Sequence, residues 1–423
     1  MNTLTKALNR FIVIYFLIYI FPFPSDYIPF VGKYVANTVQ NFWDWILPIV
    51  YEDVLGFEDK LVLEPTGSGD RTVDYLFLMV NFLLAIIVTV GSLFFSLEEN
   101  KEKKIFTYFI VTLRYFLAFT MFTYGFAKMF YLQFSQLSLY SLEQTFGNSS
   151  PMGILWRFMG YSEPYTVFTG ILEVLGGIFL IWRRTKVLGA IMCFGIMLNV
   201  FVLNLSYDVP VKLFSFHLTL MSLVILMPDY KNLMKFFLKN SPSEPITHQP
   251  YFKVKRNEII RLTVKFLLVG FVLFNGVKSS LQRQKEYGKR APEHNLYGVY
   301  EVHHFIKNGD TLSSNDPMPL LGYPQKWKKL LIDKRDSRII LMDDEQRAMK
   351  HELDTISKRF SMTSHLDESL KYEFNYKQKG NWLYLNSEQG KDSLIVNLLR
   401  KKREDFYLES RGFHWINDYP MNR

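Results

Sequence analysis

The chain has 423 residues, of which 49% are hydrophobic and 17% aromatic, and it carries a formal net charge of +9. Such a composition excludes an ordinary soluble protein of this size. The positive charges stand between long apolar runs, a placement that argues against nucleic acid binding and indicates membrane topology. The single cysteine, Cys193, lies inside an apolar run, so an intramolecular disulfide is excluded.

The N-terminal segment MNTLTKALNRFIVIYFLIYIFPFP begins like a signal peptide, because Lys6 and Arg10 precede an apolar core. Prolines and aromatic residues follow where a cleavage site would need small residues, so an uncleaved membrane anchor is predicted. The next apolar segment, YVANTVQNFWDWILPIV at 34–50, has apolar residues at helical spacing and polar residues on its other faces. This pattern predicts an interfacial helix that lies on the membrane.

A helix needs about 20 apolar residues to cross a bilayer, and seven stretches qualify or nearly qualify. The connections KEKK, RRTK and 229–261 are rich in Lys and Arg, whereas those at 24–74, 134–164 and 207–212 are poor in them. The positive-inside rule then predicts a multi-pass membrane protein with its N-terminus in the cytoplasm and its C-terminal domain outside. The predicted spans lie near residues 6–23, 75–96, 105–133, 165–182, 187–206, 213–228 and 259–279.

After about residue 281 the apolar runs become short and alternate with polar residues at period two. Seven segments are predicted strands, separated by NGD, KGN and EQG turns: YGVYEVHHF, WKKLLID, RIILM, LKYEFNY, NWLYLN, DSLIVNLL and FYLESRGFHW. The segment DEQRAMKHELDTISKRF at 344–360 fits either a helix or a long strand pair. Mostly sequential strands predict an antiparallel meander that forms a small barrel or a sandwich.

The predicted fold is therefore an α-helical polytopic membrane bundle followed by an antiparallel β-rich extracytoplasmic domain. Its parts are an N-terminal anchor, interfacial helix and second span at 1–104, a four-helix membrane core at 105–240, a cytoplasmic linker and last span at 241–280, and the β-domain at 281–423. The loop SSPMGILWRFMGYSEPY at 149–165 is apolar but too interrupted to span, and a re-entrant segment is one hypothesis.

Charged residues inside spans are costly and usually have a partner. Arg114 lies about 14 Å into the third span, and Glu173 lies about 12 Å into the fourth from the opposite side, at 1.5 Å per helical residue. Because the two depths agree within about one turn, Arg114 and Glu173 are predicted to form a buried ion pair. Gly170, Gly176 and Gly177 would let the two helices approach closely.

Lys128 shares a helix face with Arg114 but lies near the outer interface, where a snorkelling anchor is the plainer interpretation. Tyr124 is one turn away. Polar residues on other spans fall at a similar depth and together predict a cavity open to the outside: Asn81, Asn199, Asn204, Asp208, His217 and Asn275. For each asparagine alone the alternative is an interhelical hydrogen bond, and for His217 it is a satisfied core histidine.

The stretches LRYFLAFTMFTYGFAKMF, FTGILEVLGGIFLIWRRTKVLGA and LNLSYDVPVKLFSFHLTL resemble bacterial DoxX-like membrane proteins, in the long form with an outer C-terminal domain. The resemblance covers about residues 105–240 and implies a four-helix membrane unit. Together with the orientation, it implies the bacterial inner membrane and a periplasmic C-terminal domain. The related DoxD proteins serve thiosulfate:quinone oxidoreduction, and the wider group includes the HTTM domain of vitamin K-dependent gamma-carboxylase. There, a short aromatic-Gly-Lys stretch carries the lysine that deprotonates vitamin K hydroquinone. The stretch YGFAK is similar, which implies the same role for Lys128.

Two hypotheses for function follow. The first is an enzyme or redox subunit that acts on a quinone-like cofactor at the outer leaflet, with Lys128 as base, Tyr124 and His217 as a proton relay, and Arg114, Glu173, Asn199, Asn204 and Asp208 as ligand-binding residues. The second is a non-enzymatic membrane component surrounded by membrane lipid. In it, residues 281–423 dock an envelope protein or lipoprotein through aromatic anchors such as those in GFHWINDYPMNR.

Other functions have less support in the sequence. A transporter ranks below both hypotheses because no paired inverted repeat is visible. We find no motif with the spacing of a haem, iron–sulfur, flavin or zinc site, and no metal ligands are predicted. The adjacent His303 and His304 are predicted to lie in a surface strand.

Overall fold

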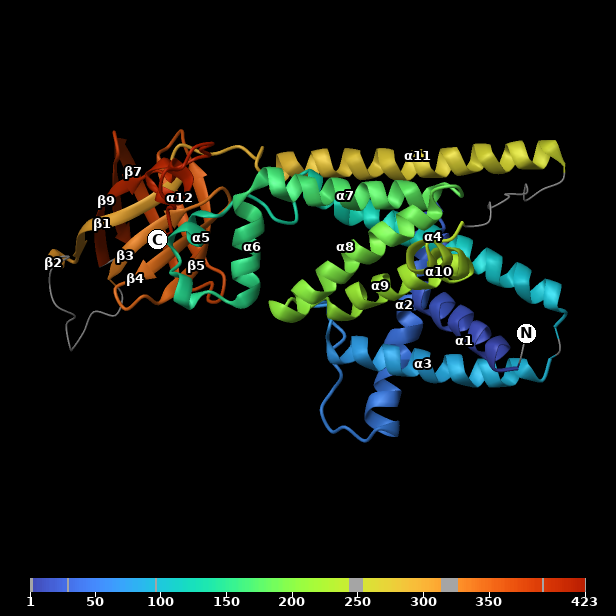
Figure 1. The fold of residues 1–423 in the computed structure, drawn as a ribbon. Helices are drawn as coiled ribbons and strands as arrows, with labels where there is room; N and C mark the ends of the chain where they lie inside the picture. Colours follow the sequence, from blue (N-terminus) through green and yellow to red (C-terminus); the bar gives the residue numbers. More distant parts are fainter. Residues whose placement is uncertain are drawn as a thin grey trace. The chain divides into compact units, whose positions relative to one another are not determined.

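The computed structural model describes residues 3–28, 30–95, 97–242, 254–312, 326–389 and 392–422 (Figure 1). The chain forms two compact units. The helical unit comprises Met1–Phe134 and Ser150–Arg283, and the β unit comprises Ser135–Ser149 and Gln284–Arg423. The predicted cytoplasmic linker falls largely on residues 243–253, outside the described residues.

Within the described residues, seven helices are long and apolar enough to cross a membrane. Helices suit that environment because all their backbone N–H and C=O groups are paired within the segment. This result confirms the predicted helical bundle. The seven are α1 Thr3–Ile20, α3 Thr72–Leu93, α4 Glu99–Met129, α7 Glu163–Ile181, α8 Lys186–Ser206, α9 Lys212–Leu226 with its continuation α10 Tyr230–Lys239, and α11 Lys255–Glu286.

Two further helices of the helical unit are too short or too polar to count as spans. Helix α2, Gly32–Ile49, forms where an interfacial helix was predicted and continues into a π-helical turn at Val50–Val54. Helix α6, Pro151–Tyr161, begins where the hydroxyl of Ser150 accepts a hydrogen bond from the backbone N–H of Gly153 at 3.0 Å. This N-cap and the proline at the first helical position explain why the interrupted apolar loop starts a helix here.

Helix α4 packs against α7 more extensively than any other pair in the helical unit. The close approach depends on glycines, as predicted. A Cβ atom at Gly177 would lie 2.9 Å from the carbonyl oxygen of Ala118, and one at Gly170 would lie 2.7 Å from the carbonyl oxygen of Gly125. Small residues at such contacts let two helix backbones meet, which is how membrane helices gain packing energy.

The β unit contains a nine-stranded antiparallel sheet in the order β2-β1-β3-β4-β5-β6-β7-β8-β9, and β1 also pairs with β9. The β1–β9 pairing closes the sheet, so the domain is a barrel rather than a sandwich. Alternate strand residues, such as Phe360 and Met362 of β6, fill its core. The strands are β1 Gly298–Lys307, β2 Asp310–Leu312, β3 Trp327–Ile332, β4 Asp336–Leu341, β5 Gln346–Asp354, β6 Arg359–Ser364, β7 Lys371–Lys379, β8 Trp382–Gln389 and β9 Asp392–Lys401.

Three local predictions in the β unit have definite outcomes. The segment at 344–360 forms a strand pair, β5 with the start of β6, and not a helix. His303 and His304 are both exposed on β1, because a bulge between Val302 and His304 interrupts the alternation. The predicted strand in FYLESRGFHW is wrong: it forms the short helix α12, Tyr407–Ser410, and an irregular tail. Within the described residues, β9 already pairs with β8 on one side and β1 on the other, so a further strand has no place beside it.

The segment 135–149 belongs to the β unit, although the sequence places it between two membrane helices. Its short helix α5, Leu139–Glu143, contributes the fully buried Leu139 to a cluster with Val299 and Leu331. Glu143 also forms an ion pair with Lys329 of β3. This apolar cluster and ion pair tie the connection between α4 and α6 to the barrel.

Candidate functional site

A cavity of about 390 Å³ lies within the helical unit, walled by α4, α6, α7, α8 and α9. Its size and largely apolar lining are typical of a site for a small lipophilic molecule. Nine polar side chains interrupt the apolar wall: Tyr124, Lys128, Gln133, Tyr165, Thr169, Glu173, Asn199, Asn204 and Ser215.

Lys128 and Glu173 form the charged part of this lining. The Lys128 ammonium Nζ donates a hydrogen bond to Oε1 of Glu173. The Lys128 side chain is 8% exposed and that of Glu173 is 1% exposed. The lysine therefore points into the helical unit, toward a carboxylate, and does not extend along the surface as a snorkelling anchor would.

The second carboxylate oxygen of Glu173, Oε2, is buried and has no hydrogen-bond partner within the described part of the chain. A buried acceptor without a donor costs about 1–3 kcal/mol. A hydroxyl group of a bound molecule could supply that donor. The ammonium of Lys128 has three N–H groups, so it can also donate to a ligand oxygen while it keeps its bond to Glu173.

The predicted ion pair between Arg114 and Glu173 is wrong. Nη2 of Arg114 donates to the backbone carbonyl of Ile181 at 3.2 Å, and Nζ of Lys265 donates to the same carbonyl at 2.7 Å. Ile181 is the last residue of α7, so the two cations lie at the negative end of that helix. Arg114 is not among the cavity-lining residues.

The depth estimate failed because α4 and α7 differ in length and register. Helix α4 has 31 residues and begins at Glu99, whereas α7 has only 19 residues. Arg114 consequently lies opposite the end of α7, and Lys128, about 21 Å farther along α4 at 1.5 Å per residue, reaches Glu173 instead.

Tyr124, Asn199 and Asn204 line the same cavity as Lys128 and Glu173, as the sequence predicts. Asn204 also joins two helices, because its Nδ2 donates to the Ser215 hydroxyl of α9 at 3.0 Å. The start of α9 is held by Asp70, whose carboxylate accepts the backbone N–H groups of Lys212 and Leu213 at 2.8 and 2.9 Å. A carboxylate at a helix N-terminus is favourable for both hydrogen bonding and the helix dipole.

His217 and Asp208 do not join the cavity, so the predicted relay from Tyr124 through His217 is wrong. His217 turns toward α1: its ring stacks on Tyr19 at 4.2 Å between centroids, and its Nε2 lies 2.7 Å from the Tyr15 hydroxyl. On α9 it lies on a different face from Ser215, because successive residues are about 100° apart. The Asp208 side chain is 83% exposed and pairs with Lys212.

The aromatic wall of the cavity was missed at the sequence level. Trp156 of α6 and Phe134 contact each other with ring centroids 5.1 Å apart, and both line the cavity. Phe168 of α7 and Phe214 of α9 also line it. The available signal was the apolar i, i+4 spacing of Leu155 and Met159 beside Trp156 in the interrupted loop, which is typical of an amphipathic helix.

No family model matches the chain, and no solved structure matches it. Over 142 residues the chain is 34% identical to the uncharacterized protein YwoB of Bacillus subtilis, and the match covers 34% of this chain and 88% of YwoB. The chain belongs to the family of YwoB. The YwoB name specifies no reaction, so the chemistry of the cavity is inferred from its lining.

This YwoB-family cavity combines one ion pair and a few uncharged polar side chains with a largely apolar and aromatic wall. The arrangement can bind a flat apolar body against Trp156, Phe134 and Phe168 and hold its polar end at Lys128 and Glu173. Low dielectric strengthens hydrogen bonds to such a pair and also makes an unpaired polar atom costly.

Proposed function

We propose that the helical unit binds a quinone-like, lipid-soluble molecule in the cavity, with its oxygen-bearing end at Lys128 and Glu173. The observation that supports this proposal most directly is the buried Glu173 carboxylate. One of its oxygens accepts from Lys128, and Oε2 has no hydrogen-bond partner among the described residues. A quinol hydroxyl would donate to Oε2, and a quinone carbonyl would accept from Lys128. The resemblance of the segment YGFAK to a lysine that deprotonates a hydroquinone supports the same assignment.

The shape of the lining supports a ring-bearing ligand over a linear one. Aromatic side chains from α6, α7 and α9 line the cavity together with Tyr124 of α4. Flat rings pack against such side chains in stacked or edge-to-face geometry, and this adds about 0.5–1.5 kcal/mol per aromatic pair to the gain from apolar burial. The volume of about 390 Å³ suits one or two fused rings with a short substituent.

Binding is tested with menadione, a naphthoquinone, and purified full-length protein in a neutral detergent. We expect menadione to quench tryptophan fluorescence saturably, and we expect Gly195→Phe to weaken binding at least about tenfold. Gly195 lines the cavity, and a Cβ atom there would meet no atom within 4 Å, so a phenyl ring can occupy the space without a backbone clash.

The matched control is Gly91→Phe, which also has no atom within 4 Å of its Cβ and is not among the cavity-lining residues. It should bind menadione like the wild type. If menadione does not bind, or binds equally to Gly195→Phe, the quinone proposal fails. The docking hypothesis then takes precedence, favoured by the exposed Phe413, Trp415 and Tyr419 of the C-terminal tail.

We further propose that the protein resides in the bacterial inner membrane with Asn381 outside and Asn100 in the cytoplasm. The charge asymmetry of the connecting loops supports this orientation. In a Cys193→Ala background, a cysteine at the exposed position Asn381 should react with an impermeant maleimide on intact cells, and one at the exposed position Asn100 should react only after lysis. The reverse pattern would invert the topology.

A further inference from the structure

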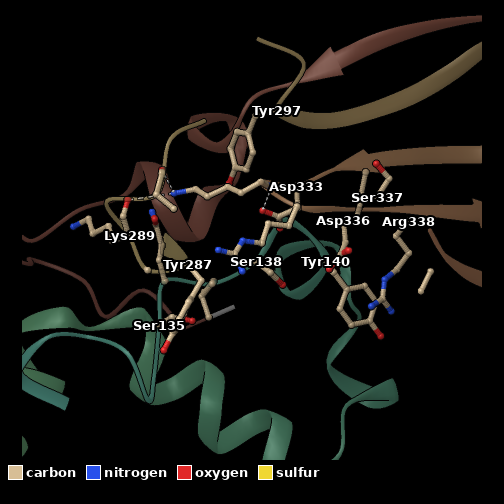
Figure 2. Close-up of a pocket in the computed structure, with 18 of the residues that line it drawn as sticks. Ser135, Ser138, Tyr140, Tyr287, Lys289, Tyr297, Asp333, Asp336, Ser337 and Arg338 are labelled. Atoms are coloured by element: carbon tan, nitrogen blue, oxygen red, sulfur yellow. Dashed lines mark hydrogen bonds between the residues drawn. The ribbon is translucent and has the colours of Figure 1, made fainter. Parts of the chain in front are cut away.

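A second cavity, of about 340 Å³, lies in the β unit (Figure 2). It is lined by the first residues of the segment 135–149, by residues that follow α11, and by the β3–β4 turn. Four basic side chains line it, Lys289, Lys334, Arg335 and Arg338, against two carboxylates, Asp333 and Asp336.

Both carboxylates already have partners. The two oxygens of Asp333 accept the backbone N–H groups of Leu139 and Lys334 at 3.2 and 2.8 Å. Asp336 lies 3.3 Å from Nε2 of His365. The carboxylates therefore stabilise the local fold. In the cavity lining, the four basic side chains outnumber these two carboxylates.

Aromatic rings orient the two arginines. The guanidinium of Arg338 lies 3.9 Å from the centroid of the Tyr140 ring (Figure 2), and that of Arg335 lies 5.7 Å from the ring of Tyr287. Stacking uses the face of a guanidinium and leaves its edge for hydrogen bonds. At that edge, Nη2 of Arg335 donates to the backbone carbonyl of Glu286, and Nη1 of Arg338 donates to Oε1 of Gln346 at 3.3 Å. Each guanidinium has five N–H donors, so further N–H groups can still reach an acceptor. Planar, pre-oriented N–H edges are the donors that suit phosphate oxygens.

The chain around this cavity is basic where it leaves the membrane-spanning segment. Helix α11 ends at Glu286, and Arg283, Lys285, Lys289 and Arg290 are all exposed around its end. Clusters of Lys and Arg beside a span attract anionic lipid headgroups. Because Tyr287 and Lys289 line the cavity directly after the span, chain connectivity keeps it near the membrane boundary.

We propose that this cavity binds a phosphate group, and that the phosphate belongs to an anionic phospholipid headgroup. Arg335 and Arg338 would donate to the phosphate oxygens, and Lys289 would add charge at the rim. This site is separate from the cavity proposed for the quinone-like ligand, and it does not depend on the function proposed above.

The test is calorimetric titration of the full-length protein, in a neutral detergent, with three probes: dihexanoyl phosphatidylglycerol, dihexanoyl phosphatidylcholine and inorganic phosphate. We expect the phosphatidylglycerol to bind and the phosphatidylcholine to bind at least about tenfold more weakly. Arg335→Gln/Arg338→Gln should weaken phosphatidylglycerol binding at least about tenfold, because two charge-assisted contacts are lost. Added salt should weaken it as well.

The matched control is Lys377→Gln/Lys379→Gln, which removes two exposed positive charges from β7 and should bind like the wild type. If the arginine variant does not fold, the exposed Lys289→Gln provides a second test with a smaller expected loss. Inorganic phosphate that binds as tightly as phosphatidylglycerol would overturn the lipid assignment. Equal binding of phosphatidylcholine, or unchanged binding by the arginine variant, would overturn the site.

Discussion

Glu173→Leu is expected to lower the free energy of unfolding of the helical unit by about 3–5 kcal/mol, because it leaves the Lys128 ammonium buried without its counter-charge. Lys128→Leu should have a similar effect, since it leaves the Glu173 carboxylate alone. The double variant should recover most of the loss, because two apolar side chains can replace a buried ion pair at little cost. The measurement is reversible unfolding in mixed micelles of SDS and a neutral detergent.

The control is the exposed pair of Glu99 and Lys103 in the first turn of α4, whose side chains are 51% and 62% exposed. Replacing either partner with leucine should change stability by no more than about 1 kcal/mol, as is usual for surface ion pairs. Single variants of Lys128 and Glu173 as stable as the wild type would contradict the pair. A double variant that loses the sum of both single effects would contradict it as well.

Gly170→Val should destabilise the helical unit by more than about 3 kcal/mol, at the upper end of overpacking effects. A Cβ atom at Gly170 would lie 2.7 Å from the carbonyl oxygen of Gly125 and 2.8 Å from the backbone nitrogen of Met129. Both are main-chain atoms that cannot rotate away, so α4 and α7 would have to separate. Thermal stability, followed by size-exclusion chromatography after heating, measures this effect.

The same substitution at Gly270 of α11 provides the comparison, because a Cβ atom there would meet nothing within 4 Å. Gly270→Val should change stability little, since both variants share the change in helix propensity and only one creates a clash. Equal losses at the two positions would show that helix propensity, and not the contact between α4 and α7, limits stability. Gly170→Val should also weaken menadione binding, because Lys128 and Glu173 lie on the two helices that separate.

Several features were predictable because they depend on local sequence. The seven spans follow from apolar runs of bilayer length, and the strands follow from period-two alternation. Of the predicted site, Lys128, Tyr124, Glu173, Asn199 and Asn204 do line one cavity. The sequence grouped Tyr124, Lys128, Asn199 and Asn204 because distance along a helix roughly determines depth in a membrane. It placed Glu173 at the depth of Arg114 instead.

Contacts between segments could not be predicted in the same way. Whether Glu173 pairs with Arg114 or Lys128 depends on the register of α4 against α7, which the facing glycines at 125 and 170 determine. The rotation of α9 decides that His217 faces α1 while Ser215 faces the cavity. Neither register nor rotation is encoded in hydropathy, because an apolar helix can present any face to its neighbours.

By itself, the sequence determined the class of each half of the molecule: a bundle of spans, then a domain of short antiparallel strands. Only the tertiary structure decided that β1 pairs with β9 to close a barrel, and that the segment 135–149 joins it. Both depend on contacts between residues far apart in the chain, such as Glu143 with Lys329. The β1–β9 contact forms because the barrel must pair its last sheet edge, and the segment 135–149 joins the barrel because Leu139 is buried there. Neither partner surface exists until the strands have assembled.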